Sequence, residues 1–373
     1  MAAAKIQQPA PLPPRLRGSA AKHCASLASG LMAALLCGAA HAQPDLQLYG
    51  LLDVNLRYDR AGNASIASLG SGLSRGSRLG WRSQEALGLG WKVSSMGEMG
   101  LNVDDGHILA TGASAPGFGR QLWIGLDHAD LGSFAVGRQY TPLFAMAAGA
   151  LDPLGANYLG AIPTTLALQG GMTARVSNAL TYSWGYGNAM DSPAPRGRFS
   201  LSAMYAPGEA QSGHHAGFAL GYGQDPWFLG YALHRSDAAT ASQPLDRHPQ
   251  MAQVLGMGYR WGEMQWLASV HRTWTAHDID RINYSVGLAA ALPRGQVVVQ
   301  ALQSRDRTWR SQDVRNLSLT FEYPMAARTV AYASYARNFN SAASTVALYQ
   351  SPIAPAAAGS MPAAFALGMR TSF

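Results

Sequence analysis

Cysteine, lysine and long apolar runs are nearly absent from most of this chain. Its 373 residues include two cysteines, Cys24 and Cys37, and both lie in an N-terminal segment that we expect to be removed. The remainder then has no disulfide, no thiolate nucleophile and no cysteine metal site. Lys92 is its only lysine, so its cations are arginines. After the leader no apolar run reaches the ~18 residues of a transmembrane helix.

The N-terminal segment has the pattern of a secretory signal peptide. Arg15, Arg17 and Lys22 precede the apolar run ASLASGLMAALLCGAA, and Ala40-His41-Ala42 provides an A-x-A cleavage site. The run is shorter than the ~20 residues that a membrane-spanning helix needs. We therefore expect a signal peptide over 1–42 and a single domain over 43–373.

That domain has almost no helical periodicity and many segments in which apolar and polar residues alternate. In 46–58, for example, Leu46, Leu48, Leu52, Val54, Leu56 and Tyr58 alternate with Gln47, Asp53, Asn55 and Arg57. Sixteen strands are predicted, at 46–58, 77–85, 90–104, 118–127, 131–139, 175–185, 197–206, 214–223, 226–234, 250–261, 263–273, 281–291, 294–304, 313–323, 327–338 and 364–373. The chain is predicted to be all-β.

An even number of strands of roughly ten residues, with short and long connections alternating, is typical of an antiparallel transmembrane β-barrel. A bilayer offers no water to an open sheet edge, so the sheet must close on itself. The short connections are assigned to the periplasm. The longer ones are assigned to the exterior, at 59–76, 105–117, 140–174, 235–249, 274–280, 305–312 and 339–363.

The final strand is alternating to its last residue. Phe365, Leu367, Met369 and Phe373 lie on one face, and small or polar residues lie on the other. We expect this strand to pair with the first strand and to turn its apolar face to lipid. Phe373 then lies at the aromatic girdle of the membrane interface.

Alternation also predicts which arginines face the lumen. A charge on the lipid face costs ~2–4 kcal/mol at the midplane, so mid-strand arginines are expected to point inward. Arg57, Arg78, Arg82, Arg175, Arg198, Arg281 and Arg370 have the inward parity. Arg120 and Arg138 do not, because they share a face with apolar neighbours; a bulge or a snorkelling side chain is expected to resolve each.

The chain resembles the general bacterial porins of Gram-negative outer membranes, and most closely their proteobacterial, anion-leaning branch. The resemblance is carried by LYGLLDVNLRY (48–58), SRLGWRSQEALGLGWKV (77–93), EMGLNVDDG (98–106), FGRQLWIGLDHADLGSFAVGRQYTPLF (118–144), RVSNALTYS (175–183) and Phe373. It implies a sixteen-stranded homotrimer in the outer membrane, in contact with lipid and lipopolysaccharide. It also implies recognition of the C-terminal strand by the barrel-assembly machinery.

The resemblance further implies that the third long loop, 140–174, folds inward to form a constriction. Family arginines on the wall opposite this loop match Arg78, Arg120 and Arg175, and Arg82 matches a nearby basic position. The Pro-Glu-Phe-Gly motif usual in this loop is missing, and Asp152 is the only acid in it. How the loop is held therefore stays open at this point.

Together these residues predict electrostatic filtering without chemistry. Arginines on one wall of a narrow aqueous passage attract anions, and their charge persists beside like charges. We expect passive diffusion of small hydrophilic or anionic solutes with anion preference. The alternative for the arginines is ordinary ion pairing with Asp53, Glu98, Asp104 or Glu322.

Other functions remain as alternatives. The length of loop 140–174, with Phe144 and Tyr158 in it, leaves a substrate-specific channel open, and so does a non-conducting barrel that acts as adhesin or receptor. No nucleophile or zinc-hydrolase motif indicates an enzyme. His214-His215 alone does not make a metal site, and no cofactor is expected. The arginines are too dispersed for nucleic-acid binding.

Overall fold

The computed structural model describes residues 45–108, 117–160, 173–185, 199–208, 213–237 and 249–373. The predicted signal peptide, 1–42, lies outside the described residues. The strands are β1 (Asp45–Ala61), β2 (Ala64–Ser71), β3 (Arg78–Gly88), β4 (Trp91–Gly100), β5 (Gln121–His128), β6 (Gly132–Tyr140), β7 (Arg175–Trp184), β8 (Phe199–Ala206), β9 (His215–Gln224), β10 (Trp227–Ser236), β11 (Gln250–Trp261), β12 (Met264–Trp274), β13 (Asp280–Leu292), β14 (Gly295–Asp306), β15 (Val314–Ala326), β16 (Thr329–Asn340) and β17 (Ala363–Ser372). Two short helices follow β6, namely α2 (Pro142–Phe144) and the π-helix η1 (Ala145–Ala150).

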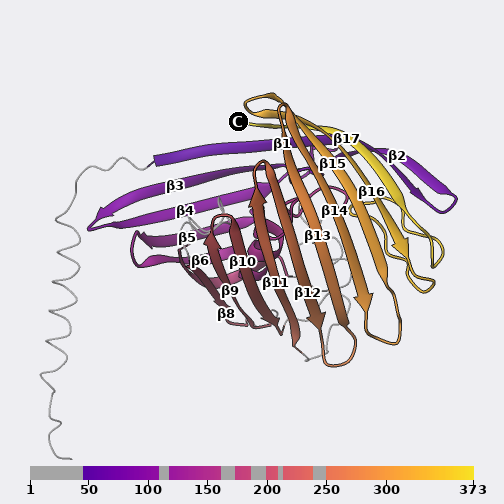
Figure 1. The fold of residues 1–373 in the computed structure, drawn as a ribbon. Helices are drawn as coiled ribbons and strands as arrows, with labels where there is room; N and C mark the ends of the chain where they lie inside the picture. Colours follow the sequence, from indigo (N-terminus) through magenta and orange to yellow (C-terminus); the bar gives the residue numbers. More distant parts are fainter. Residues whose placement is uncertain (1–44, 109–116, 161–172, 186–198, 209–212, 238–248) are drawn as a thin grey trace, which may run out of the picture. The chain divides into compact units, whose positions relative to one another are not determined.

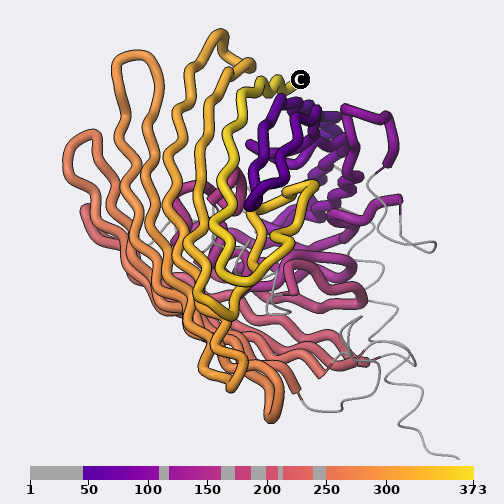
Figure 2. The backbone as a smooth tube through the Cα atoms, turned by 90° about the vertical axis from the view of Figure 1, so that its right-hand side faces the viewer, coloured from indigo at the N-terminus to yellow at the C-terminus, as the bar shows by residue number. Residues whose placement is uncertain are grey.

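The strands form one closed antiparallel sheet (Figure 1). Each strand from β3 to β17 pairs with the next, and β17 pairs with β1 in the register Leu51↔Ser372 to Arg60↔Ala363. Figure 2 shows this closure, with yellow β17 beside indigo β1. The all-β barrel predicted from alternation is therefore confirmed.

Seventeen strands fill sixteen positions of the barrel because β2 and β3 share one position. The C-terminal half of β1, Val54–Ala61, pairs with β2, and its N-terminal half, Asp45–Leu51, pairs with β3. Between them, residues 72–77 leave the sheet; we call them the inner segment. All sixteen predicted strands are present, but the long loop predicted at 59–76 is wrong. Its first part turns tightly at Gly62, with φ +65°, and continues as β2.

β2 was missed because its sequence, ASIASLGS, has few large apolar residues to mark an alternation. The segment still forms a strand because the C-terminal half of β1 offers a complete row of backbone hydrogen-bond donors and acceptors with which it pairs. No helix among the described residues is long and apolar enough to cross a membrane.

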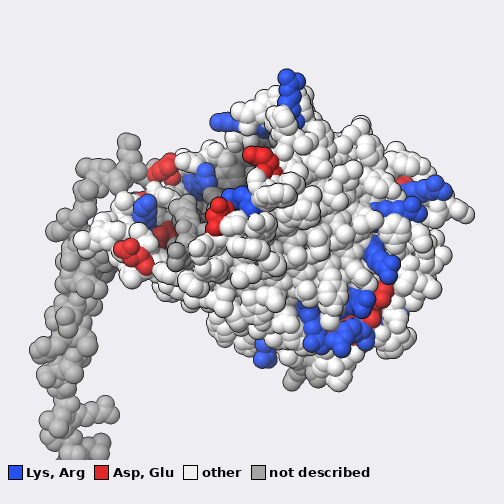
Figure 3. All heavy atoms as spheres, viewed as in Figure 1, with Lys and Arg blue, Asp and Glu red and all other residues white. Residues whose placement is uncertain are grey.

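The two faces of the wall differ sharply in chemistry. Outward side chains are large, apolar and exposed, for example Leu48 at 76% and Leu255 at 60%. Inward side chains are polar and buried, for example Asp53, Asn283 and Gln300, each at 0%. Figure 3 shows a mostly uncharged surface over β11–β14, with charged side chains nearer the strand ends. This is the arrangement that a hydrocarbon exterior and a wet lumen require.

Exposed aromatic side chains lie near strand ends on the outer surface. They include Tyr205, Trp227, Trp261, Trp266, Phe321 and Tyr323. The rings of Trp227 and Tyr259 lie 4.4 Å apart across the β10–β11 pair. Amphipathic rings at this level suit the lipid headgroup region.

Phe373 closes the barrel through its backbone and its ring. Its N–H donates to the Gly50 carbonyl and its carbonyl accepts from the Gly50 N–H, both at 3.0 Å. A Cβ on Gly50 would lie 2.2 Å from the Phe373 ring, so the ring fits over this glycine because it has no side chain. Gly50 shares the outward parity of Leu48, and Phe373 is 57% exposed. The ring therefore lies on the lipid-facing side.

Candidate functional site: the constriction of the lumen

The loop between β6 and β7 contacts the inner wall of the barrel. We call it the inner loop, residues 141–174, of which 141–160 and 173–174 are described. Thr141 caps its first helix by accepting a hydrogen bond from the Phe144 N–H at 3.1 Å. The loop then contacts β10, β11, β13 and β15 in sequence, which are the strands on one side of the ring.

Three wall glycines make room for the inner loop. A Cβ on Gly230 would lie 2.4 Å from the Met146 sulfur. On Gly256 it would lie 2.7 Å from Leu151, and on Gly287 it would lie 2.4 Å from the Pro153 Cγ. Glycine in a strand often marks a site where another backbone approaches closely. These positions hold the loop without the family motif that is missing here.

A polar latch holds the far end of the described part of the inner loop. Tyr158 donates its hydroxyl proton to Glu322 and accepts a hydrogen bond from Arg370 at 2.8 Å. Arg370 pairs with both oxygens of Glu322, at 2.7 and 3.0 Å. Burial, and then the Glu322 charge, raise the pKa of Tyr158 well above its usual value. The tyrosine therefore stays protonated and keeps donating.

The inner segment meets the inner loop through its backbone. The Tyr158 N–H donates to the Leu73 carbonyl at 2.7 Å, and the Ser74 hydroxyl donates to the Tyr158 oxygen at 2.9 Å. Leu73 is fully buried. Two inward excursions of the chain are thus joined inside the barrel, although they are far apart in sequence.

Asp152, predicted at the constriction, stabilises the loop itself. Its carboxylate accepts from the backbone N–H groups of Leu154 and Ala156, at 2.9 and 3.0 Å, and from Gln300 of the wall at 3.3 Å. It is 4% exposed. The acid fixes a turn against the wall, and its carboxylate is almost fully buried.

Three predicted arginines meet on the side of the ring opposite the inner loop. Glu98 accepts from Arg78 at 3.3 Å and from Arg120 at 3.0 Å. The Tyr140 hydroxyl accepts from Arg120 at 2.9 Å and from Arg175 at 2.6 Å. These residues come from β3, β4, β6, β7 and the residue before β5. We call them the arginine cluster: Arg78, Arg120 and Arg175 with Glu98 and Tyr140.

Arg175 is the least neutralised member of the arginine cluster. Its guanidinium lies 4.3 Å from the centre of the Tyr140 ring, a cation–π geometry. Its Nε is buried and has no hydrogen-bond partner among the described residues. Glu98 is shared by the other two arginines, so the carboxylate charge does not balance the cluster.

Arg75 belongs at this site and was missed from the sequence. It lies on the inner segment, and its backbone N–H donates to Asp53 at 2.7 Å. Its guanidinium is exposed and makes no hydrogen bond or salt bridge within the described part of the chain. No alternation marks it, because the inner segment has left the sheet. The only sequence signal was a short Gly-rich stretch, SGLSRGS, before β3.

Arg120 and Arg138 share the parity of apolar residues in the sequence, and the structure accommodates their charges in different ways. Arg120 precedes the first residue of β5, so strand parity does not apply to it, and it reaches Glu98 in the lumen. Gly76 leaves space for it, since a Cβ there would lie 2.9 Å from its Nη1. Arg138 lies beside a register shift between β6 and β7 and donates to the Gly119 carbonyl at 2.8 Å.

Of the other predicted arginines, those that the structure describes lie outside the arginine cluster. Arg82 donates to Gln47 at 2.9 Å and lies 5.9 Å from the Tyr49 ring centre. Arg57 pairs with Asp59 at 2.6 Å and donates to the carbonyls of Tyr349 and Gln350 in the β16–β17 loop. Arg198 lies outside the described residues.

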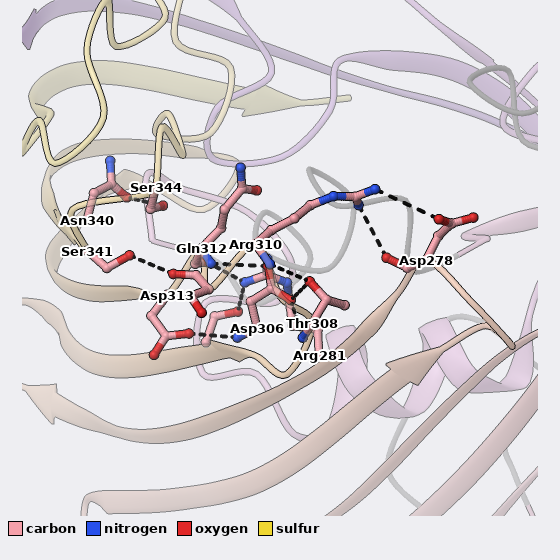
Figure 4. Close-up of polar contacts among 12 residues, drawn as sticks. Asp278, Arg281, Asp306, Thr308, Arg310, Gln312, Asp313, Asn340, Ser341 and Ser344 are labelled. Carbon is pink, nitrogen blue, oxygen red and sulfur yellow. Dashed lines mark hydrogen bonds and ion pairs between the residues drawn. The ribbon is translucent and has the colours of Figure 1, made fainter.

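Arg281 has a structural role at the loop end of β13. It pairs with Asp306 at 3.3 Å and donates to Ser304 and to the Gln312 carbonyl (Figure 4). Asp306 and Asp313 accept backbone N–H groups in the same network, and Arg310 reaches Asp278. The network joins neighbouring loops.

Comparison with known proteins decides the family. A profile described as Gram-negative porin matches residues 27–343. The chain belongs to this porin family. It is an outer-membrane channel for the passive diffusion of small solutes, and its closed barrel agrees with that location.

Individual porins are similar over different lengths. An outer membrane porin protein of Bordetella pertussis is 31% identical over 171 residues, which cover 42% of this chain and 43% of that protein. Outer membrane porin protein 32 of Delftia acidovorans is 27% identical over 83% of this chain and 88% of its own. The solved anion-selective porin of Comamonas acidovorans has a TM-score of 0.76 at 22% identity and is matched over its whole length, with 89% of this chain covered.

Proposed function

We propose that this porin prefers anions and that the arginine cluster with Arg75 sets the preference. One observation carries the proposal: at the constriction guanidinium groups outnumber carboxylates, and Glu98 and Glu322 are each already paired with arginine. Arg75 and Arg175 have no carboxylate partner among the described residues, and Arg78 and Arg120 share a single carboxylate. Cations lining a narrow aqueous passage raise the local anion concentration. The anion selectivity of the Comamonas porin supports the same interpretation.

The test is a planar-bilayer recording of the purified porin under a salt gradient. We expect a reversal potential that indicates anion preference, larger at 0.01 M than at 1 M salt because the Debye length falls from about 30 Å to about 3 Å. A cation preference at low salt contradicts the proposal. A protein that inserts and passes no current supports instead a non-conducting adhesin or receptor.

We also propose a homotrimer, held in lipid and lipopolysaccharide and assembled through recognition of its C-terminal strand. The apolar outer wall and the lipid-facing Phe373 support this. Current steps are expected to group in threes as single trimers insert. Steps of one uniform size without such grouping contradict the trimer. Passage through the pore needs no chemical step, and we propose that the porin catalyses no reaction.

A further inference from the structure

A polar cavity of about 250 Å³ lies between the inner loop and the barrel wall. Its wall includes Gln265 on β12 and Gln296 on β14, and Arg75 of the inner segment borders it. Gln265 and Gln296 lie at the strand ends next to the short turns, which are assigned to the periplasm. The cavity is therefore on the periplasmic side of the inner loop.

The charged groups that border the cavity differ in whether they already have bonding partners. The carboxylate of Asp152 is engaged by two backbone N–H groups and Gln300. The carboxylate of Glu322 is engaged by Arg370 and Tyr158. Arg75 has no ion-pair partner among the described residues. Arg75 is therefore the cation at the cavity that can bind an anionic group, while the hydrogen-bond acceptors of both carboxylates are already engaged.

The neutral groups of the cavity indicate what the rest of a solute would carry. The side-chain amides of Gln265 and Gln296 make no hydrogen bond within the described part of the chain, and an amide both donates and accepts. Hydroxyl groups satisfy both roles. Leu267, Ala289 and Val298 form an apolar floor, each less than 7% exposed. A carbon chain with hydroxyls on one side fits such a surface.

We infer that this cavity is a solute subsite for small hydroxylated monocarboxylates, with the carboxylate at Arg75 and the hydroxyls at Gln265 and Gln296. The inference rests on the proposed anion preference, which brings the carboxylate to the constriction. A second carboxylate would find amides and the carboxylates of Asp152 and Glu322 at the cavity, so monoanions are favoured over dianions. The arginine cluster on the opposite wall is not needed for the hydroxyl contacts.

The experiment is solute block of chloride current in the intact porin, with gluconate, hexanoate and glucose as probes. Gluconate and hexanoate share chain length and charge, and gluconate and glucose share hydroxyls. We expect saturable block by gluconate at a concentration at least about threefold lower than by hexanoate, from one or two net hydrogen bonds. Glucose is expected to block least. Equal block by gluconate and hexanoate overturns the inference.

Variants separate the subsite from selectivity. Gln265→Leu with Gln296→Leu keeps the charge, so the reversal potential should be unchanged while gluconate becomes no better than hexanoate. Gln303→Leu, on β14 with the parity opposite to Gln296, is the matched control and should keep the discrimination. If gluconate still blocks the double variant at a lower concentration than hexanoate does, the subsite is wrong and the proposed anion preference is unaffected. If the unmodified porin shows no anion preference, the proposed function itself is wrong.

Discussion

The double variant Arg75→Glu with Arg175→Glu is expected to conduct cations in preference to anions. These two arginines have no carboxylate partner among the described residues, whereas Arg78 and Arg120 share Glu98 and Arg370 holds Glu322. Each substitution changes the local charge by two units. Arg78 and Arg120 keep one unit of net positive charge beside Glu98, and the two new carboxylates outweigh it, so the sign of the field along the passage should change.

The size of this effect follows from Coulomb's law. A unit charge at ~10 Å in water contributes roughly 0.4 kcal/mol, and screening at one Debye length in 0.1 M salt reduces this to about a third. Four units of change act with opposite sign on anions and cations. The permeability ratio should therefore shift by on the order of tenfold, because about 1.4 kcal/mol is tenfold.

The measurement is the reversal potential under a salt gradient. Arg60→Glu with Arg294→Glu is the matched control, with the same total charge change at the outer end of β1 and in the β13–β14 turn. The control should shift the permeability ratio much less. If both double variants shift it equally, net charge and not the constriction sets the preference.

Gly287→Val is expected to lower single-channel conductance by roughly half, since conductance follows the open width. A Cβ at Gly287 lies 2.4 Å from the Pro153 Cγ, whereas carbon atoms pack at about 3.5–4.0 Å. β13 is held by full ladders to β12 and β14, so the inner loop must move instead. It moves away from its wall and toward the arginine cluster opposite, which narrows the passage.

A second substitution checks this cause. Pro153→Ala removes the Cγ and Cδ, which lie 2.4 and 3.1 Å from the built Cβ, and keeps the Cβ at 3.4 Å. It should restore most of the conductance in the Gly287→Val background. Ala301→Val, on the exposed outward face of β14, is the control and should leave conductance unchanged. A rise in conductance of Gly287→Val would show that the loop detaches from the wall, contrary to this account.

Strand alternation predicted the barrel well because the two solvents of the wall enforce it residue by residue. Lipid outside and water inside make parity costly to violate, so the inward positions of Arg57, Arg78 and Arg175 follow from the alternation alone. Arg120 does not follow the strand parity because it precedes β5, which begins at Gln121. Three glycines at inward strand positions, Gly230, Gly256 and Gly287, could have indicated where the inner loop contacts the wall, because glycine in a strand often marks the close approach of another segment.

The inner loop and the inner segment had no comparable signal. Arg75 carries no periodicity, and nothing in the sequence around Asp152 shows that it holds a turn of the inner loop. Which groups neutralise each other depends on partners far apart in sequence, such as Tyr158 with Glu322 and Arg370.

The sequence by itself determined the closed all-β wall, its lipid-facing and water-facing sides and the inward parity of its mid-strand arginines, because these follow from local alternation and the solvent on each face. Only the tertiary structure decided which charges stay free in the lumen. That outcome depends on distances between segments that fold inward from different parts of the chain.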